Sequence, residues 1–431
     1  MPDAPIRTRT PWAWIPTLYL AEGLPYVVVM TVSVIMYKGF KISNTDIALY
    51  TSWLYLPWVI KPLWSPVVDI LGTRRRWIWV TQLLIGGGLA GVALTLPLPN
   101  FFQWTLALFW LMAFDSATHD IAADGFYLLG TTEDQQAFFV GVRTMFYRIA
   151  TIAGQGLLVM LAGRIQDQGG SVAFAWSVAM GVLAVLFVGF GLWHRFILPR
   201  PETDRPGEAR EIPHFVQEFL ATFGSFFRKP RIVVLMLFLL LYRFGEAQLV
   251  KMAAPFLLDA RDQGGLALTT TEVGFIYGTI GILALTFGGI LGGWVVSRRG
   301  LKEWLWIMLL AIHLPDAVFI YLAYAQPTNL PLIQLCVAVE QFGYGFGFTA
   351  YLMYMIHIAR GPHQTAHYAI CTGFMALGMM LPGMWSGWLA DHIGYRHFFN
   401  WVIIATIPSF IVALWIPLEA GFGRKAQAEG A

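Results

Sequence analysis

Apolar stretches of about 20 residues, long enough to cross a lipid bilayer, recur along the whole chain. Hydrophobic residues make up 57% of the sequence and charged residues 12%, against about 25% charged residues in an average soluble domain. Because a backbone in lipid must satisfy its own hydrogen bonds, these stretches predict helices. We expect an all-α membrane protein with twelve spans, at residues 12–36, 46–70, 77–97, 103–129, 136–162, 172–195, 231–258, 272–296, 303–325, 331–358, 364–389 and 398–419.

One long polar connection separates the first six spans from the last six. It begins with LPRPETDRPGEAREIP and continues with HFVQEFLATFGSFF, in which phenylalanines recur at helical spacing. The second piece is expected to form an amphipathic helix on the membrane surface. The predicted organisation is an N-terminal half, a linker, a C-terminal half and a tail, at residues 1–195, 196–230, 231–420 and 421–431.

The Lys and Arg residues are distributed unevenly between the two sets of alternating loops. Of the 28 Lys and Arg residues, 18 fall in the set that contains both termini and the linker. Cytoplasmic loops carry the excess of these residues, so both termini are predicted to lie in the cytoplasm and the protein in the cytoplasmic membrane. The opposite set of loops holds only Lys38, Lys41, Arg164, Arg261 and Arg396.

The two halves of the chain repeat each other weakly but in nearly one register. NTDIALYTS at 44–52 resembles TTEVGFIYG at 270–278, and AGRIQDQGG at 162–170 resembles SGWLADHIG at 386–394. A similar offset relates YLAEG to YRFGE, which makes Glu22 equivalent to Glu246, and relates Asp115 to Glu340. The repeat therefore indicates which charged positions correspond in the two halves.

Two six-helix halves joined by a cytoplasmic linker resemble the major facilitator superfamily, a resemblance that implies a substrate site at the midplane between the halves. DILGTRRR at 69–76 is similar to the loop between the second and third helices of that superfamily. The resemblance implies a cytoplasmic gate made by Asp69 with Arg74, Arg75 or Arg76. The alternative is that these arginines only set the orientation in the membrane.

Two shorter segments narrow the resemblance. KPLWSPVVD at 61–69 and ATHDIAADGF at 117–126 are similar to the branch that contains the muropeptide permease AmpG, the acetyl-coenzyme A transporter and some siderophore permeases. The matching positions include Lys61, Asp69, Asp120 and Asp124. The chain departs from the branch at His119, where the family has an amide.

The span at 103–129 carries four ionisable side chains in two pairs. At about 100° per residue, Asp115 and His119 share one face, and Asp120 and Asp124 share another, about 140° away. We expect Asp115, with His119, to lie near the midplane and to carry the coupling proton. Asp120 and Asp124 lie closer to the cytoplasm, where Lys61, Arg143 or the gate loop could neutralise them. Structural ion pairing is the alternative for both pairs.

Five further charged residues lie inside predicted spans and are candidates for the substrate cavity. Glu22 and Arg148 belong to the N-terminal half, and Arg243, Glu246 and Glu340 belong to the C-terminal half. Arg148 suits an anionic ligand because its planar guanidinium can bind a carboxylate or phosphate through two contacts, although it could instead pair with Asp115.

Alternatives remain for several of these positions. Arg243 and Glu246 are three residues apart and could simply neutralise each other. Lys251 is expected near the end of its span, where a lysine snorkels to the membrane surface. His313, before LPD, is expected to mark a kink.

The sequence favours a transporter over an enzyme or a channel. It contains no HExxH motif, no serine elbow and no clustered His/Cys set, so we predict no enzymatic activity, no cofactor and no metal. A channel would more often repeat one pore helix by oligomerisation. In the absence of a phosphate-binding loop, a transporter must draw on a gradient, and carboxylates with a histidine favour protons.

The predicted function is a proton-coupled secondary transporter that imports a polar or anionic solute by alternating access. The resemblance implies anhydro-muropeptides as the solute, with an iron-chelate siderophore or an acetyl-coenzyme A conjugate as the alternative. The expected partners are the solute, protons and the lipid bilayer. A monomer is expected, and nucleic acid is not.

Overall fold

The computed structural model describes residues 10–205, 212–419 and 421–424, except for the side chains of residues 66, 67, 69, 70, 133, 134, 137, 212–219 and 365. The helices of the described residues form twelve spans. The first six spans consist of α1 with α2 (Ile15–Val27, Ser33–Gly39), α3 with α4 (Asn44–Trp53, Leu56–Leu71), α5 (Arg74–Thr95), α6 (Phe101–Leu129), α7 with α8 (Glu133–Thr151, Val159–Asp167) and α9 (Val172–Ile197). The linker contains α10 (Ile212–Phe227).

The last six spans contain α11 and α12 (Ile232–Leu241, Phe244–Leu258), α13 and α14 (Thr270–Phe275, Ile282–Arg299), α15 and α16 (Leu301–His313, Ala317–Ala325), α17 (Leu330–Ala359) and α18 with α19 (Gln364–Ala405, Ile407–Ala413). By length and hydropathy alone, eight helices of the described chain could cross a membrane. One of them, Ala366–Ala413, comprises the last two spans. The break predicted between residues 389 and 398 is a single residue, Gly394, whose positive φ of 74° interrupts an otherwise continuous helix.

Several spans are interrupted near their middle. The second span breaks between α3 and α4, where Pro57 opens α4, and the ninth breaks at the 3₁₀ turn η7 (Leu314–Asp316), which contains Pro315. Proline lacks a backbone N–H and its ring clashes with the preceding turn. The first, fifth and eighth spans contain π-helical turns, η2 (Val28–Val32), η3 (Ile152–Leu158) and η6 (Ile276–Gly281). Such turns often mark functional sites in helices.

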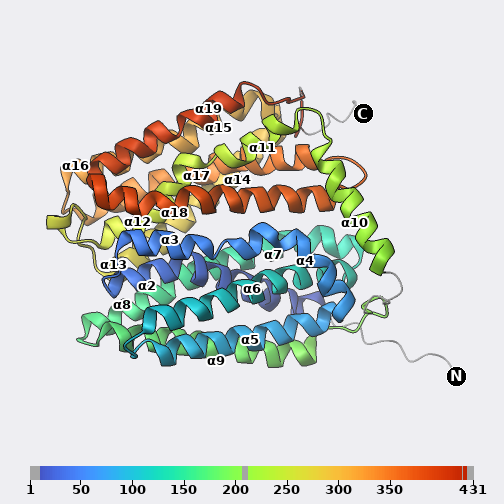
Figure 1. The fold of residues 1–431 in the computed structure, drawn as a ribbon, viewed down its shortest axis with the longest axis horizontal. Helices are drawn as coiled ribbons and strands as arrows, with labels where there is room; N and C mark the ends of the chain where they lie inside the picture. Colours follow the sequence, from blue (N-terminus) through green and yellow to red (C-terminus); the bar gives the residue numbers. More distant parts are fainter. Residues whose placement is uncertain (1–9, 206–211, 420, 425–431) are drawn as a thin grey trace.

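The two halves form two layers, with α10 and both ends of the described chain, which we call the termini below, at one end of the molecule (Figure 1). They meet along α3 with α18 and along α8 with α13. Glycines bring these helices together, since a Cβ at Gly387 would overlap the Asn44 carbonyl oxygen and a Cβ at Gly163 would overlap the Thr271 backbone nitrogen. The turns η3 and η6 also meet, at Gln155 and Gly278. Small residues allow this close approach in membranes.

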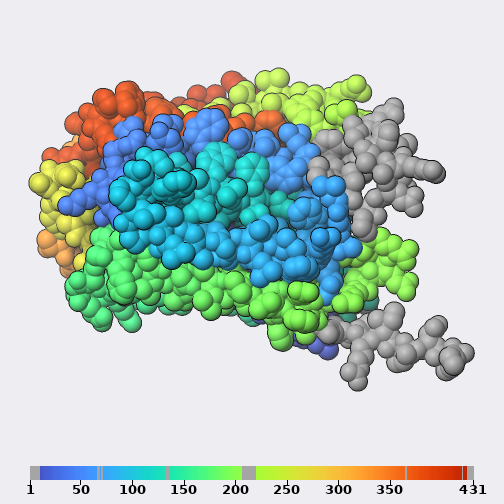
Figure 2. Space-filling view, turned by 60° about the horizontal axis from the view of Figure 1, so that its bottom comes forward, coloured from blue at the N-terminus to red at the C-terminus, as the bar shows by residue number. Residues whose placement is uncertain are grey.

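The outer surface of the N-terminal half is apolar. Helices α5, α6 and α9 lie side by side on the face seen in Figure 2. These helices expose large hydrophobic side chains, including Leu94, Trp104, Leu111, Val185 and Phe196. Such a contiguous apolar surface is expected of helices that face lipid.

Candidate functional site

A cluster of three carboxylates lies inside the N-terminal half. Glu22 comes from α1, and Asp120 and Asp124 come from one face of α6. A carboxylate oxygen of each residue lies within 4.8 Å of the other two. Glu22 is 8% exposed, and its Oε2 has no hydrogen-bond partner among the described residues. Like charges so close together in an apolar interior require cations or protons to neutralise them.

Two cations contact this cluster. Lys61 of α4 donates through Nζ to Asp120, and Arg143 of α7 forms an ion pair with Asp124 Oδ1 at 2.9 Å. The Arg143 guanidinium carbon also lies 4.7 Å from the ring centroid of Tyr19, whose hydroxyl donates to Asp124 at 3.3 Å. Lys61 and Arg143, two of the partners that the sequence offered for Asp120 and Asp124 beside the gate loop, thus lie against these carboxylates. Two cations nevertheless face three carboxylates, so one negative charge is uncompensated if all three are ionised.

The other pair on α6 has different surroundings. His119 is buried and lies 2.9 Å from the Gln82 amide nitrogen of α5, and the Gln82 amide oxygen lies 2.8 Å from Nδ1 of His194 on α9. The chain of hydrogen bonds ends at Thr17 of α1, 3.0 Å from Nε2 of His194. His119 therefore points into the bundle of the N-terminal half. Asp115 is partly exposed, and no ion pair or hydrogen bond joins its carboxylate to another described residue.

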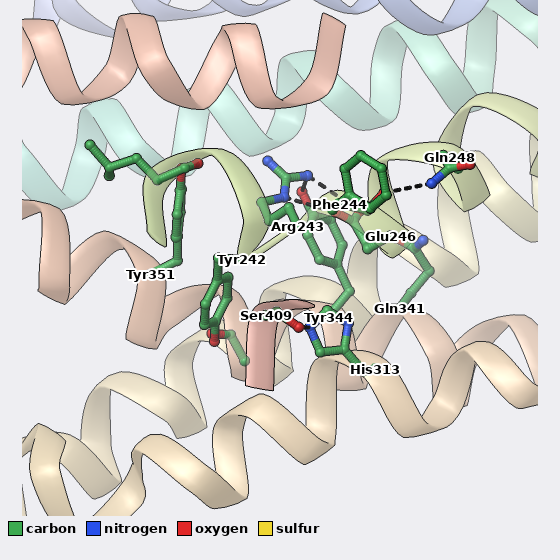
Figure 3. Close-up of polar contacts among 12 residues, drawn as sticks. Tyr242, Arg243, Phe244, Glu246, Gln248, His313, Gln341, Tyr344, Tyr351 and Ser409 are labelled. Carbon is green, nitrogen blue, oxygen red and sulfur yellow. Dashed lines mark hydrogen bonds and ion pairs between the residues drawn. The ribbon is translucent and has the colours of Figure 1, made fainter. Parts of the chain in front are cut away.

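An ion pair occupies the break in the seventh span. The helix stops at Leu241 and restarts at Phe244, and Arg243 between them donates through Nε to Glu246 Oε2 at 2.8 Å (Figure 3). Arg243 also donates to the Tyr344 hydroxyl at 2.7 Å, and its guanidinium lies 4.7 Å from the ring centroid of Phe348. The predicted alternative of mutual neutralisation is therefore present, and it leaves Arg243 facing a tyrosine of α17.

Arg148 is placed differently from the other cations. No ion pair or hydrogen bond joins its guanidinium to another described residue, so the predicted alternative of pairing with Asp115 is absent. Arg148 acts electrostatically on Tyr147 of its own helix and on Tyr344 of the other half. Arg243 in turn acts on Tyr26 of α1. Cationic and phenolic groups from both halves thus face one another between the halves.

Glu340 lies deep inside the C-terminal half. It is buried on α17, and its carboxylate accepts a hydrogen bond from the neighbouring Gln341 amide at 3.0 Å. It acts electrostatically on Tyr277 of η6. Its repeat equivalent, Asp115, has no such neighbours, so the repeat does not extend to the surroundings of these two carboxylates.

The sequence model of the Major Facilitator Superfamily matches residues 17–314. The chain belongs to this superfamily. The family match and the helical arrangement confirm the predicted fold of twelve spans in two halves, and they identify the protein as a membrane transporter.

Relatives of the AmpG type match this major facilitator over almost its whole length. "Putative transporter AmpG 4" of Rickettsia conorii is 25% identical over 93% of this chain and 94% of its own. The anhydromuropeptide permease of Escherichia coli K12 is 23% identical over 92% of this chain and 78% of its own. The resemblance to the AmpG branch, drawn from two short segments, therefore extends along the chain.

Solved structures of other major facilitators have the same fold. A D-xylose-proton symporter superposes with a TM-score of 0.70 at 13% identity, covering 96% of this chain and 98% of its own. The nucleoside transporter NupG superposes with a TM-score of 0.67 at 16% identity, covering 93% of this chain and 96% of its own. At these identities the likeness concerns the fold alone.

The arginines of the predicted gate loop bind the linker and α9. The backbone N–H groups of Arg74 and Arg75, at the start of α5, donate to the two carboxylate oxygens of Asp204 at 2.8 and 3.0 Å. The Arg75 guanidinium donates to the carbonyl oxygens of Leu198 and Arg195. Arg76 is exposed, and the side chain of Asp69 lies outside the described residues. The described bonds thus attach this loop to the N-terminal half and its linker.

At the end of the molecule opposite the termini, a buried polar network joins the halves. Lys38 of α2 binds Asp259 Oδ1 at 2.7 Å and donates to the Asn44 side-chain oxygen at 2.7 Å. Tyr395 completes the network, because its hydroxyl donates to Asp259 Oδ2 at 2.6 Å and accepts from the Asn44 amide at 3.0 Å. Lys38 and Asn44 belong to the N-terminal half, and Asp259 and Tyr395 to the C-terminal half, so the four residues hold this end closed.

At the same end, two residues that are equivalent in the half-chain repeat make equivalent contacts with the opposite half. Asp391 Oδ2 accepts from the Thr45 backbone N–H at 2.9 Å and from its hydroxyl at 2.7 Å. Its repeat equivalent, Asp167, accepts from the Thr271 hydroxyl at 2.7 Å. Each carboxylate thus lies at the N-terminus of a helix from the other half, where the helix dipole favours a negative charge.

Lys251 is not at the membrane surface, where it was expected. It lies in the middle of α12, is 6% exposed, and donates to the Thr51 hydroxyl of α3 at 3.0 Å. The reason is that α12 packs against α3 and α18, so the lysine cannot reach the surface. Sequence reasoning also missed Gln82, His194 and Tyr395, because their partners lie on other helices, between 37 and 351 residues away.

Proposed function

We propose that the chain is a proton-coupled importer of polar, anionic solutes, with anhydro-muropeptides as the first candidate. The observation that carries the proposal is the cluster of Glu22, Asp120 and Asp124, in which two described ion pairs, to Lys61 and Arg143, serve three carboxylates. The family match supports the broader conclusion that the protein moves small solutes across a membrane.

Glu22 is our first candidate for the residue that carries the proton. With one proton on the cluster, two carboxylates and two cations balance, and the site can be buried without a net charge. Asp120 and Asp124 each already accept from a cation, whereas Glu22 is buried with one oxygen unpartnered. Asp115 becomes the second candidate, because His119 is engaged with Gln82.

Arg148 is our candidate for binding an acidic group of the solute. Its guanidinium has no described carboxylate partner and acts on Tyr344 across the boundary between the halves. A planar guanidinium binds carboxylates and phosphates through two parallel hydrogen bonds. A solute with a carboxylate, such as a muropeptide, would supply the missing negative charge.

Alternating access would use the contacts that close the end opposite the termini. Lys38, Asn44, Asp259 and Tyr395 join the halves there, so opening to that side requires these bonds to break. We propose that both termini are cytoplasmic and that the membrane is the cytoplasmic one, as the Lys and Arg distribution predicts. We also propose that the transporter acts as a monomer.

Uptake into proteoliposomes tests the function. Labelled anhydro-muropeptide, a ferric siderophore and acetyl-coenzyme A would be offered separately, with and without an acidic exterior. We expect accumulation of the muropeptide only when the exterior is acidified. If the siderophore or acetyl-coenzyme A accumulates instead, that solute replaces the muropeptide as the proposed substrate. Equal uptake with and without the acidic exterior would contradict proton coupling.

Two matched substitutions locate the proton. Glu22→Gln, which imitates the protonated acid, should abolish accumulation driven by the gradient and retain exchange of solute for solute. Asp115→Asn removes a carboxylate that has no described partner and should retain coupling. The reverse pattern would transfer the role from Glu22 to Asp115.

A further inference from the structure

The break in the ninth span buries a carboxylate that the transport cycle described above does not use. The 3₁₀ turn Leu314–Asp316 separates α15 from α16, and it places Asp316 in the interior of the C-terminal half with 1% of its surface exposed. Helix α17 passes close to the break, because a Cβ at Gly343 would approach the Pro315 ring to 2.7 Å. Asp316 therefore lies between packed helices.

Both carboxylate oxygens of Asp316 lack a hydrogen-bond partner among the described residues. The charged groups that act on Asp316 are themselves acidic, namely Glu340 from α17 and Glu246 from α12. Helices α15, α16 and α18 also pack against the break and contribute no charged group that acts on it among the described residues. His313, at the end of α15, is the nearest titratable group along the chain; its Nε2 lies 2.9 Å from the Ser409 hydroxyl, and its Nδ1 has no hydrogen-bond partner among the described residues.

An ionised carboxylate without a donor or a cation is strongly disfavoured in such an interior. Arg243 cannot supply the charge, because it is already paired with Glu246. Asp316 and Glu340 thus form no ion pair with a cation among the described residues. Glu340 precedes Gly343, which packs on Pro315, by three residues on α17, so the two acids belong to one apolar region. The repulsion between like charges there is relieved when one of the two acids is protonated.

We propose that Asp316 and Glu340 form a second proton-binding site, in the C-terminal half and separate from the cluster at Glu22. The site takes a proton from water on one side of the membrane and returns it to water on the other side. The proposal deepens the proton coupling proposed above and rests on it for its role in transport. The binding of the proton itself can be tested without transport.

The site is connected to the boundary between the halves. Glu340 accepts from the Gln341 amide, and the Gln341 side chain packs on η6, since a Cβ at Gly281 would lie 3.1 Å from its Cγ. Gly278 of the same turn abuts the backbone of Gln155 in η3, the π-helical turn of the fifth span. A change in charge at Glu340 can therefore alter the contact between η6 and η3, which must shift when the halves rock.

Infrared difference spectroscopy of the purified protein tests the protonation. A protonated carboxyl group has a C=O stretch that an ionised carboxylate lacks, so titration with acid and base reports the buried acids. We expect carboxyl absorption at neutral pH that contains a band from Asp316, and this band should be lost in Asp316→Asn while the absorption from the cluster at Glu22 remains. Glu303→Gln, which removes an exposed carboxylate from α15 of the same span, should leave the band unchanged. A band unaffected by Asp316→Asn would overturn the proposal.

Proton counting in proteoliposomes tests the role in transport. With one proton at each site, the wild type should move two protons per solute and Asp316→Asn should move one. An unchanged ratio would mean that Asp316 keeps its proton throughout the cycle and would overturn its role in coupling. If the wild type moves no protons at all, the proposed function fails, while the infrared band still decides whether Asp316 is protonated.

Discussion

Removing the hydroxyl of Tyr395 should open the end of the molecule opposite the termini. The substitution Tyr395→Phe keeps the ring, which packs 5.2 Å from Phe256 and 6.1 Å from Phe399, centroid to centroid. It removes the hydrogen bond donated to Asp259 and the one accepted from Asn44. The Lys38–Asp259 ion pair remains. The perturbation is therefore confined to two bonds, one of which spans the two halves.

The size of the effect follows from these bonds. The bond that Asn44 donates to the Tyr395 hydroxyl spans the halves, and a hydrogen bond between neutral groups contributes about 0.5–1.5 kcal/mol. The bond between Tyr395 and Asp259 lies within the C-terminal half, so opening need not break it, but without it Asp259 is held less firmly against Lys38. We take about 1.4 kcal/mol for the combined loss to the closed state, which corresponds to about tenfold in the ratio of open to closed molecules.

Accessibility of position 52 can measure this ratio. Ser52 is buried between the halves, where a Cβ at Gly383 would lie 2.7 Å from its hydroxyl. In a Ser52→Cys background, a membrane-impermeant thiol reagent applied from outside should react about tenfold faster when Tyr395→Phe is present. Tyr324→Phe is the matched control, because the Tyr324 hydroxyl bonds Asn400 within the C-terminal half.

Equal labelling rates in Tyr395→Phe and in the control would refute the reasoning. That result would mean that the network does not limit opening, and that Asp391 with Thr45 and Asp167 with Thr271 hold the halves together. Faster labelling in both variants would instead indicate general loosening of the C-terminal half.

Three further predictions concern the N-terminal half and the orientation. Lys61→Met leaves Asp120 without its cation, so it should reduce uptake more than tenfold and lower the melting temperature. The double variant with Asp120→Asn no longer has the unpaired charge, so its melting temperature should recover. His119→Gln should retain transport, since an amide can still bond Gln82, whereas His119→Leu should lower the free energy of unfolding by about 1–3 kcal/mol. A reporter enzyme that works only in the cytoplasm should be active when it is fused after Ala431. Activity of a reporter that works only outside the cytoplasm would contradict the predicted orientation.

The sequence predicted the fold well because the bilayer restricts what an apolar chain can form. Span length, the need for internal hydrogen bonds and the half-chain repeat are local or periodic properties, so they can be recognised without contacts. The repeat also identified Asp167 and Asp391 as equivalents, and both bind the opposite half in the same way. The pairing of Lys61 and Arg143 with the aspartates of α6 was predicted from span position and charge.

The surroundings of each ionisable group were decided by tertiary structure. Helical geometry correctly separated Asp115 and His119 from Asp120 and Asp124, but it could not show which face meets the neighbouring helices. That choice turned His119 toward Gln82 and brought Glu22 to the aspartates.

The same limit applies in the C-terminal half. The helix break at Pro315 could be expected from the sequence, but the isolation of Asp316 beside Glu340 could not. Burial and pairing depend on residues hundreds of positions apart, as with Lys251 and Thr51 or Asn44 and Tyr395. A local pattern gives the cost of placing a charge in a membrane, but only the packed helices determine whether a partner is there to offset it.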